Sequence, residues 1–186
     1  MSNCDKSIDK KAYRDCDKIA YPSRFSKIAI IDALLCSEEH FIRCYLRALR
    51  LEEYYTFYSP NKWLKYYYKR KKNLLGCKLG FFIAAGCFGK GLKIYHYGSV
   101  IVNPKARIGE NCTLHGNCCI GSKGGFPDDS PVIADNVDIG QNAQVLGGIT
   151  VASGVKIGAG AIVTKSVLTP YVTLVGIPAR IVSKID

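Results

Sequence analysis

Residues 133–163 read IADNVDIGQNAQVLGGITVASGVKIGAGAIV, and in this stretch an aliphatic residue recurs at every sixth position. The register continues upstream across one gap, and all nine of its positions hold Ile, Leu or Val: Ile108, Leu114, Ile120, Ile133, Ile139, Val145, Val151, Ile157 and Val163. A fixed six-residue period is typical of a solenoid in which each repeat is one short strand plus a corner. We therefore expect a parallel β-helix whose coils each take three repeats.

A second small or apolar residue follows the aliphatic position by four and completes the predicted core: Cys112, Cys118, Val137, Ala143, Ile149, Val155, Ala161 and Val167. Residues 121–132 interrupt the series with glycines, prolines and aspartates, which predicts a loop that leaves the coil. The pattern extends upstream to about Leu79. We thus expect a mainly β domain of about five coils over residues 77–186, which includes this loop and a C-terminal tail.

Residues 1–76 lack the six-residue period and show helical spacing instead. Apolar residues recur along one stripe between residues 24 and 76: Ile31, Leu34, Leu35, Phe41, Ile42, Tyr45 and Leu49. Ser37 predicts one N-cap, Ser59-Pro60 predicts another helix start, and Gly76 predicts a helix stop. The sequence therefore predicts a small α-helical N-terminal region of two or three short helices.

Composition places the 186-residue chain among globular proteins, since 48% of its residues are hydrophobic and 22% are charged. It contains no run of about 18 apolar residues, so we expect no transmembrane segment. The first residues lack the charged-then-apolar layout of a secretory signal, which predicts a cytoplasmic protein. Its nine cysteines are odd in number and lack CxxC spacing, so we expect reduced thiols rather than disulfides or a metal site.

The net charge of +11 is concentrated in the N-terminal part, most densely in residues 65–72, KYYYKRKK. Aromatic residues interleaved with cations occur in sites for nucleic acids and anionic polymers. No recognised nucleic-acid motif accompanies this segment, so we expect no nucleic-acid partner. A solvated helix face is the simplest interpretation, while contact with an anionic polymer or a peripheral membrane surface remains open.

The run GLKIYHYGSVIVNP, residues 91–104, resembles the serine acetyltransferase-like branch of the hexapeptide acyltransferases. Residues 157–182, which begin IGAGA and end VGIPARIV, are similar to that family's ending. The resemblance covers roughly residues 79–186. It implies a left-handed β-helix, a homotrimer with active sites between subunits, and acetyl-CoA as the acyl donor.

In that family a histidine at the position matched by His96 takes the proton of an acceptor hydroxyl as the hydroxyl attacks the acetyl thioester. The resemblance thus implies that His96 is the general base, a role suited to an imidazole, whose ordinary pKa of about 6.5 leaves it largely neutral in cells. His115 lies about one coil further along. It is a candidate for a supporting role, with a structural corner residue as the other interpretation.

The resemblance also implies that CoA lies between subunits along the late coils. Cationic side chains there would suit its phosphates, and small residues would admit the pantetheine arm. The matching positions are Gln141, Ala159, Thr164, Lys165, Arg180 and Lys184.

Several residues depart from a serine-specific site. Tyr95 stands where the family has an aspartate before its histidine, Ser130 lies where it has an arginine-histidine-proline run, and Phe81 replaces an aspartate that pairs with the base. Whatever orients His96 therefore differs, a backbone carbonyl being one option. An amino-acid acceptor needs a cation for its carboxylate and an acid for its ammonium, and the matching charged residues are absent. We therefore expect a sugar or polysaccharide acceptor, as in capsular or surface polysaccharide biosynthesis. The residues expected to face it are Tyr95, Tyr97, Phe126, Asp128 and Asp129.

Three alternatives use the same scaffold. A serine O-acetyltransferase of cysteine biosynthesis is the nearest, and a non-catalytic β-helix that serves as a trimerisation scaffold comes from a different class. A zinc hydratase needs three converging histidine ligands, whereas the repeat region holds only His96 and His115. We therefore expect no metal.

Overall fold

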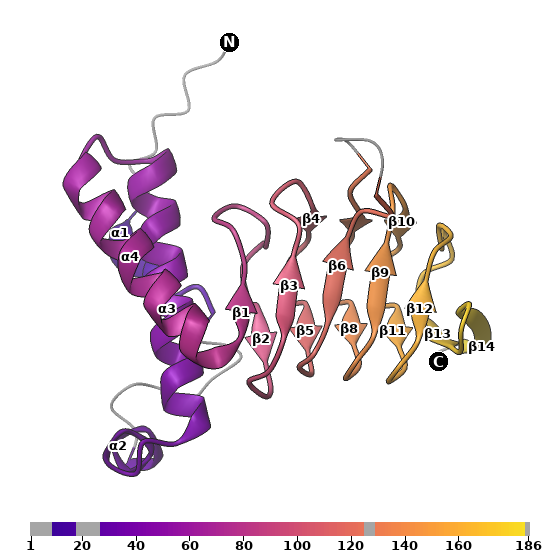
Figure 1. The fold of residues 1–186 in the computed structure, drawn as a ribbon, viewed down its shortest axis with the longest axis horizontal. Coiled ribbons are helices and arrows are strands. Elements are labelled where there is room, and N and C mark those ends of the chain that lie inside the picture. The colour runs from indigo at the N-terminus through magenta and orange to yellow at the C-terminus, as the bar shows by residue number, and fades with distance from the viewer. Residues whose placement is uncertain (1–8, 18–26, 125–128, 185–186) are drawn as a thin grey trace.

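The computed structural model describes residues 9–17, 27–124 and 129–184, in which four helices stand at one end of a column of strands (Figure 1). The helices pack mainly on one another, and helix α3 also contributes to the core of the column. Their bounds are α1 (Lys10–Arg14), α2 (Lys27–Leu34), α3 (Glu38–Phe57) and α4 (Lys62–Leu79).

The column is a β-helix with three sheets, in which each strand up to β13 lies in a different sheet from the strand before it. The first sheet has the order β1-β3-β6-β9-β12, the second β4-β7-β10, and the third β2-β5-β8-β11-β13-β14. Every pairing is parallel except the last, between β13 and β14, which is antiparallel and closes the C-terminal end. The strands are β1 (Phe81–Phe82), β2 (Lys93–Ile94), β3 (Val100–Val102), β4 (Arg107–Ile108), β5 (Thr113–Leu114), β6 (Cys119–Gly121), β7 (Val132–Ile133), β8 (Asp138–Ile139), β9 (Gln144–Leu146), β10 (Thr150–Val151), β11 (Lys156–Ile157), β12 (Ile162–Val163), β13 (Val172–Val175) and β14 (Arg180–Lys184).

The six-residue series forms the core of this column, which confirms the prediction. All nine aliphatic positions are buried, and none exposes more than the 5% of Ile108. The second series is buried as well, from Cys112 onward, except Val167, which is partly buried against the same core. Each strand from β1 to β13 buries only one or two side chains, so the stacking of coils supplies the apolar contacts that a single repeat lacks.

Helix α3 begins where the sequence predicts, but α4 does not. The Ser37 hydroxyl accepts a hydrogen bond from the His40 amide, as expected of an N-cap. Helix α4 instead begins after Asn61, whose side chain accepts from Leu64 N–H, so Pro60 lies before the cap and not at the first helical position. The predicted start at Ser59-Pro60 is therefore wrong by two residues.

The predicted helix stop at Gly76 is also wrong, because α4 continues to Leu79 and ends at Gly80. Gly80 has φ = +79°, the left-handed conformation that favours glycine after a helix. Gly76 serves a different purpose, since a Cβ there would lie 2.5 Å from the Phe81 carbonyl oxygen. It allows α4 to approach the first strand closely.

The predicted apolar stripe is buried in only one of its two helices. Ile42, Tyr45 and Leu49 of α3 have no exposed surface, whereas Ile31 and Leu34 in α2 are exposed. Tyr45 of α3 packs on the first strand of the β-helix, where it meets Phe81 edge-on with the ring centroids 5.1 Å apart.

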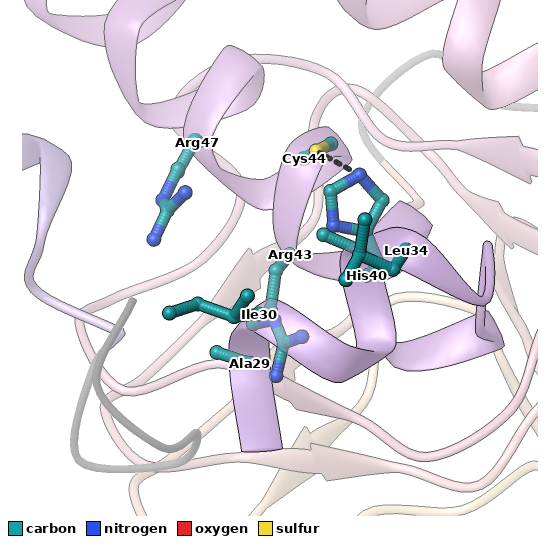
Figure 2. A pocket seen from close by; sticks show the side chains of 8 residues that line it. Ala29, Ile30, Leu34, His40, Arg43, Cys44 and Arg47 are labelled. Atoms are coloured by element: carbon teal, nitrogen blue, oxygen red, sulfur yellow. Dashed lines mark hydrogen bonds between the residues drawn. The ribbon is translucent and has the colours of Figure 1, made fainter. Parts of the chain in front are cut away.

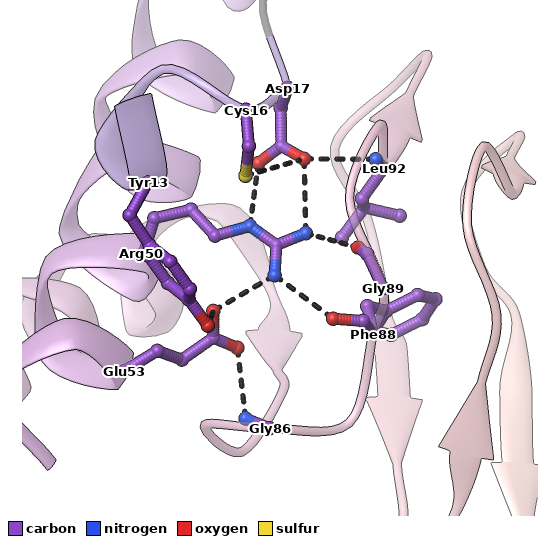
Figure 3. Close-up of polar contacts among 9 residues, drawn as sticks. All are labelled: Tyr13, Cys16, Asp17, Arg50, Glu53, Gly86, Phe88, Gly89 and Leu92. Carbon is purple, nitrogen blue, oxygen red and sulfur yellow. Dashed lines mark hydrogen bonds and ion pairs between the residues drawn. The ribbon is translucent and has the colours of Figure 1, made fainter. Parts of the chain in front are cut away.

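A buried ion-pair network also joins α3 to the β-helix (Figure 3). The Arg50 guanidinium donates to Asp17 at 2.8 and 3.0 Å and to Glu53 at 2.8 Å, and its remaining N–H groups reach the carbonyl oxygens of Phe88 and Gly89. Burial raises the pKa of Glu53, and the charge of Arg50 opposes that rise. The network satisfies a buried cation with two carboxylates and two backbone acceptors.

Candidate active site

His96 lies on an outer edge of the β-helix, in the turn between β2 and β3. Ile94 at the end of β2 is buried in the core, and the chain then turns outward, so 64% of the His96 side chain is exposed. The residues on either side are exposed as well, Tyr95 by 41% and Tyr97 by 60%. The six-residue register predicts this outward position, because His96 falls outside the inward-facing series.

The carboxylate of Glu38, the first residue of α3, holds the His96 turn at two points. One oxygen accepts a hydrogen bond from the Tyr97 amide at 2.5 Å, and the other lies 3.3 Å from His96 Nδ1. The N-terminus of a helix favours a carboxylate, because its amides carry partial positive charge. A side chain of the helical region, and not the suggested backbone carbonyl, therefore contacts the ring.

No sequence signal could have identified Glu38 as this partner. It is separated from His96 by 58 positions and precedes the six-residue repeat. Phe81, which stands where the family has its aspartate, is buried under Tyr45 and does not supply a polar contact. The contact depends on how α3 docks on the first coils.

Tyr95 and His115 stack on neighbouring coils, with ring centroids 4.6 Å apart and planes inclined by 24°. Asp138, one coil further, lies 2.8 Å from His115 Nε2, while Lys93 Nζ donates to the Tyr95 hydroxyl at 2.9 Å. These side chains form a ladder on the third sheet, beside His96. His115 is thus held by two partners, and Tyr95 has one ring face covered.

Residues two positions after the third-sheet aliphatics form a row along the edge that carries His96. The register pairs Ile94 with Leu114, Leu114 with Ile139, and Ile139 with Ile157. The row therefore runs His96, Gly116, Gln141, Ala159. A Cβ on Gly116 would lie 3.3 Å from the His96 carbonyl oxygen, which confirms that the two positions are neighbours. Coils stack at about 4.8 Å, so Ala159 lies about 14 Å from His96 along the edge.

The other predicted CoA-side residues lie toward the C-terminal end of the column. Thr164 and Lys165 follow β12, and the Thr164 carbonyl accepts from Lys123 Nζ at 2.8 Å. Arg180, which begins β14, is exposed, and Lys184 ends that strand. These residues are several coils from His96 in one chain.

The predicted acceptor-side loop is on a different edge from His96. It connects β6 in the first sheet to β7 in the second, whereas His96 lies between the third sheet and the first. Asp129 accepts hydrogen bonds from the amides of Gly148 and Lys123, which fixes the loop against its own coil. Phe126 and Asp128 lie outside the described residues. One chain does not bring Asp129 and His96 together.

The core cysteines are not candidates for chemistry. Cys112 and Cys118 are buried, and burial raises the pKa of both thiols, that of Cys112 to about 11. Their thiolate forms are therefore scarce at neutral pH. In the described part of the chain, no group of three His, Cys, Asp or Glu side chains could hold a metal ion.

A separate hollow of about 440 Å³ lies between α2 and α3 (Figure 2). His40 and Cys44 meet on its wall, with 3.6 Å between Nε2 and Sγ, and Arg43 is paired there with Asp32. His96 does not line this hollow. His40 is thus half-buried in the helical region and takes no part in the candidate site.

The described fold is that of left-handed β-helix enzymes. Solved serine acetyltransferases share it: soybean serine acetyltransferase aligns with a TM-score of 0.73 at 25% identity over 93% of this chain and 69% of its own. A serine acetyltransferase in complex with CoA aligns with a TM-score of 0.68, also at 25% identity and with the same coverage. Because the alignments cover most of this chain, they include helices as well as strands.

The curated relatives match about half of this chain. The serine acetyltransferase of Buchnera aphidicola subsp. Schizaphis graminum is 36% identical over 103 residues, which are 54% of this chain and 39% of the relative. The serine acetyltransferase of Escherichia coli strain K12 is 37% identical over 55% of this chain and 37% of its own. The chain thus spans less than half the length of the curated relatives it matches. No family model matches the sequence.

Together these similarities support a hexapeptide-repeat acyltransferase family. They name serine acetyltransferases, so they favour the serine alternative and give no support to the expected polysaccharide type. None of the helices in the described ranges is long and apolar enough to cross a bilayer.

Proposed function

We propose that this chain is an acetyl-CoA-dependent O-acetyltransferase with His96 as its general base. The observation that carries the proposal is the exposed His96 ring on the β-helix edge, with Glu38 at 3.3 Å from Nδ1. The similarity of this chain to serine acetyltransferases supports acetyl transfer as the class of reaction. The proposed enzyme thus combines His96 as the base with a β-helix edge along which the extended acetyl-CoA can lie.

The contact with Glu38 assigns roles to the two ring nitrogens. With Nδ1–H donated to the carboxylate, Nε2 keeps its lone pair and is the atom that accepts the acceptor's hydroxyl proton. The hydroxyl oxygen then attacks the acetyl carbonyl carbon, the carbon–sulfur bond breaks, and the CoA thiolate leaves and takes up a proton. Glu38 stabilises the imidazolium that forms in between, so it is a positioning residue.

The row along the His96 edge supports the position of the donor. Gly116 and Ala159 are small, and Gln141 and Ala159 are exposed on successive corners, so an extended thioester arm could lie against the backbone and reach His96. Lys165 and Arg180 are exposed cations suited to the phosphates. Because one chain keeps Asp129 and His96 on different edges, we infer that a homotrimer assembles the complete site between subunits.

L-serine is the first acceptor that we propose, because the curated relatives named above are serine acetyltransferases. A sugar hydroxyl is the second candidate, and a specific observation favours it. Tyr95 and Tyr97 flank the base with exposed side chains, and the nearby cation Lys93 is engaged by Tyr95, to whose hydroxyl it donates a hydrogen bond. Aromatic rings suit a sugar face, whereas an amino acid needs charged partners.

Release of the CoA thiol from acetyl-CoA, measured with L-serine and with a panel of oligosaccharides, tests both acceptors. We expect turnover with L-serine, and turnover with oligosaccharides alone would select the sugar candidate. His96→Ala should lower kcat by about 10²–10⁴-fold, the usual contribution of a general base. His40→Ala is the matched control, since His40 lies at the separate hollow, and near-wild-type activity of His96→Ala would refute the mechanism.

A further inference from the structure

Helix α4 turns an aromatic face toward the outside of the molecule. Trp63 is 87% exposed, Tyr66 62%, Tyr67 58% and Leu74 52%. They recur at helical spacing and so share one face of the helix. Only Lys72, Gly76 and Leu79 are buried, on the opposite side that meets α3 and the first strand. The outer face thus carries large aromatic and apolar side chains where a surface helix usually has polar ones.

The same helix carries an unbalanced positive charge. Residues 62–79 contain seven Lys or Arg and no Asp or Glu. Lys72 is paired with Glu52 at 2.9 Å, whereas Lys69, Arg70 and Lys71 are exposed. At 3.6 residues per turn, Lys69 and Lys71 lie on the two sides of the aromatic face, and Arg70, seven residues after Trp63, lies within it. The outer surface of α4 therefore combines exposed aromatic rings with one cation on each flank and one, Arg70, among them.

We propose that this outer surface of α4 binds an anionic lipid bilayer. Helices that lie in the plane of a membrane interface combine an apolar, Trp-rich face with Lys and Arg at its borders. Trp and Tyr rings suit the headgroup region, and long cationic side chains extend from the apolar strip to the lipid phosphates. Helix α4 presents this pattern outward, where a flat surface can reach it.

Charge argues against a second copy of the chain as the occupant. Two α4 helices face to face would bring together the exposed Lys69, Arg70 and Lys71 of each copy, six cations, and residues 62–79 contain no carboxylate to balance them. Like charges repel over about 8 Å at physiological ionic strength. A purely electrostatic polyanion would use the cations and leave the exposed Trp63 and Leu74 without an apolar contact, whereas a bilayer matches both features.

Trp63 is the chain's single tryptophan, so its fluorescence reports directly on this surface. The full chain is titrated with vesicles of phosphatidylcholine and with vesicles of phosphatidylcholine and phosphatidylglycerol in equal parts. We expect Trp63 emission to move to shorter wavelength, with protection from acrylamide, only when phosphatidylglycerol is present. Each cation near the membrane changes partitioning about fivefold, so Lys69→Gln with Lys71→Gln should weaken it about 30-fold.

The control removes the same charge elsewhere: Lys90→Gln with Lys156→Gln, two exposed lysines of the β-helix. It should bind as the wild type does, and both double variants should keep the wild-type melting temperature. Equal losses in the two double variants would overturn the proposal, as would equal binding to both kinds of vesicle. A Trp63 response to a single-stranded oligonucleotide or a sulfated polysaccharide, with none to vesicles, would also overturn it.

Discussion

The β-helix and the helical region bury their residues by different rules. In the β-helix one interaction is repeated: an aliphatic residue stacks on its equivalent in the next coil, as Leu114 does on Ile139. In the helical region single contacts dominate, such as Arg50 with Asp17 and Glu38 with His96. A repeat distributes its stability over many equivalent contacts, while the helical region depends on a few that have no substitute.

The difference also separates scaffold from site. The β-helix places His96 and the row that ends at Ala159, because its register fixes which corners align. The helical region supplies the carboxylate that contacts the base. The candidate site thus needs both parts, and each can be perturbed separately.

Removal of Arg50 should have the largest effect, because it breaks the junction between the two regions. Arg50→Ala leaves Asp17 and Glu53 buried without their cation, which typically costs about 3–5 kcal/mol in free energy of unfolding. Chemical denaturation followed by circular dichroism measures it. Arg107→Ala, at an exposed β-helix arginine, should lose far less. Equal losses would show that the network does not join the regions.

Glu38→Gln should have the next largest effect and would show whether the helical region serves the base. Glutamine can still accept from Tyr97 N–H, but it has no charge to stabilise an imidazolium, and a hydrogen bond between charged groups is worth about 1.5–3 kcal/mol, or about 10–100-fold in rate. We expect kcat to fall by that factor, with an unchanged KM for acetyl-CoA.

Glu39→Gln is the matched control for this variant. Glu39 is adjacent, and its carboxylate contacts Arg43; its substitution should leave kcat unchanged. A higher acceptor KM at constant kcat in Glu38→Gln would instead mean that Glu38 contacts the acceptor. His96→Ala would still lower kcat by about 10²–10⁴-fold in that case, so the two outcomes remain distinct.

Thiol labelling should perturb the protein least, and we expect the cysteines of the two regions to differ clearly in their reactivity. Cys36 and Cys77 of the helical region are exposed, whereas Cys112 and Cys118 lie in the β-helix core with pKa values raised by burial. Iodoacetamide at pH 8 should modify the first pair and spare the second, as measured by peptide mass spectrometry. Modification of Cys112 in the native protein would contradict the buried register.

The sequence predicts the β-helix well because periodic burial is a local property. The nine aliphatic residues of the six-residue series predict nine buried positions, and the interruption at residues 121–132 predicts the loop. The start and end of α4 are predicted less well, because Asn61 competes with Ser59 as a cap and Gly76 has a packing reason for being glycine.

The candidate site is predictable only in part. The outward position of His96 follows from the register, and Asp138 near His115 follows from the pairing of adjacent coils. Glu38 does not, because no periodicity relates residues 58 positions apart on different kinds of element. For the same reason, the sequence does not predict which charged side chains of a neighbouring subunit would complete an acceptor site.

The row from His96 to Ala159 has a length that is fixed by the number of coils between the two residues. Each coil adds one fixed step of about 4.8 Å to that edge, whatever its side chains are. A whole coil inserted between the two residues would lengthen the edge by one step without turning either residue inward, whereas an insertion of fewer than six residues would break the phase. The length of ligand that this edge can span therefore changes in increments set by the backbone.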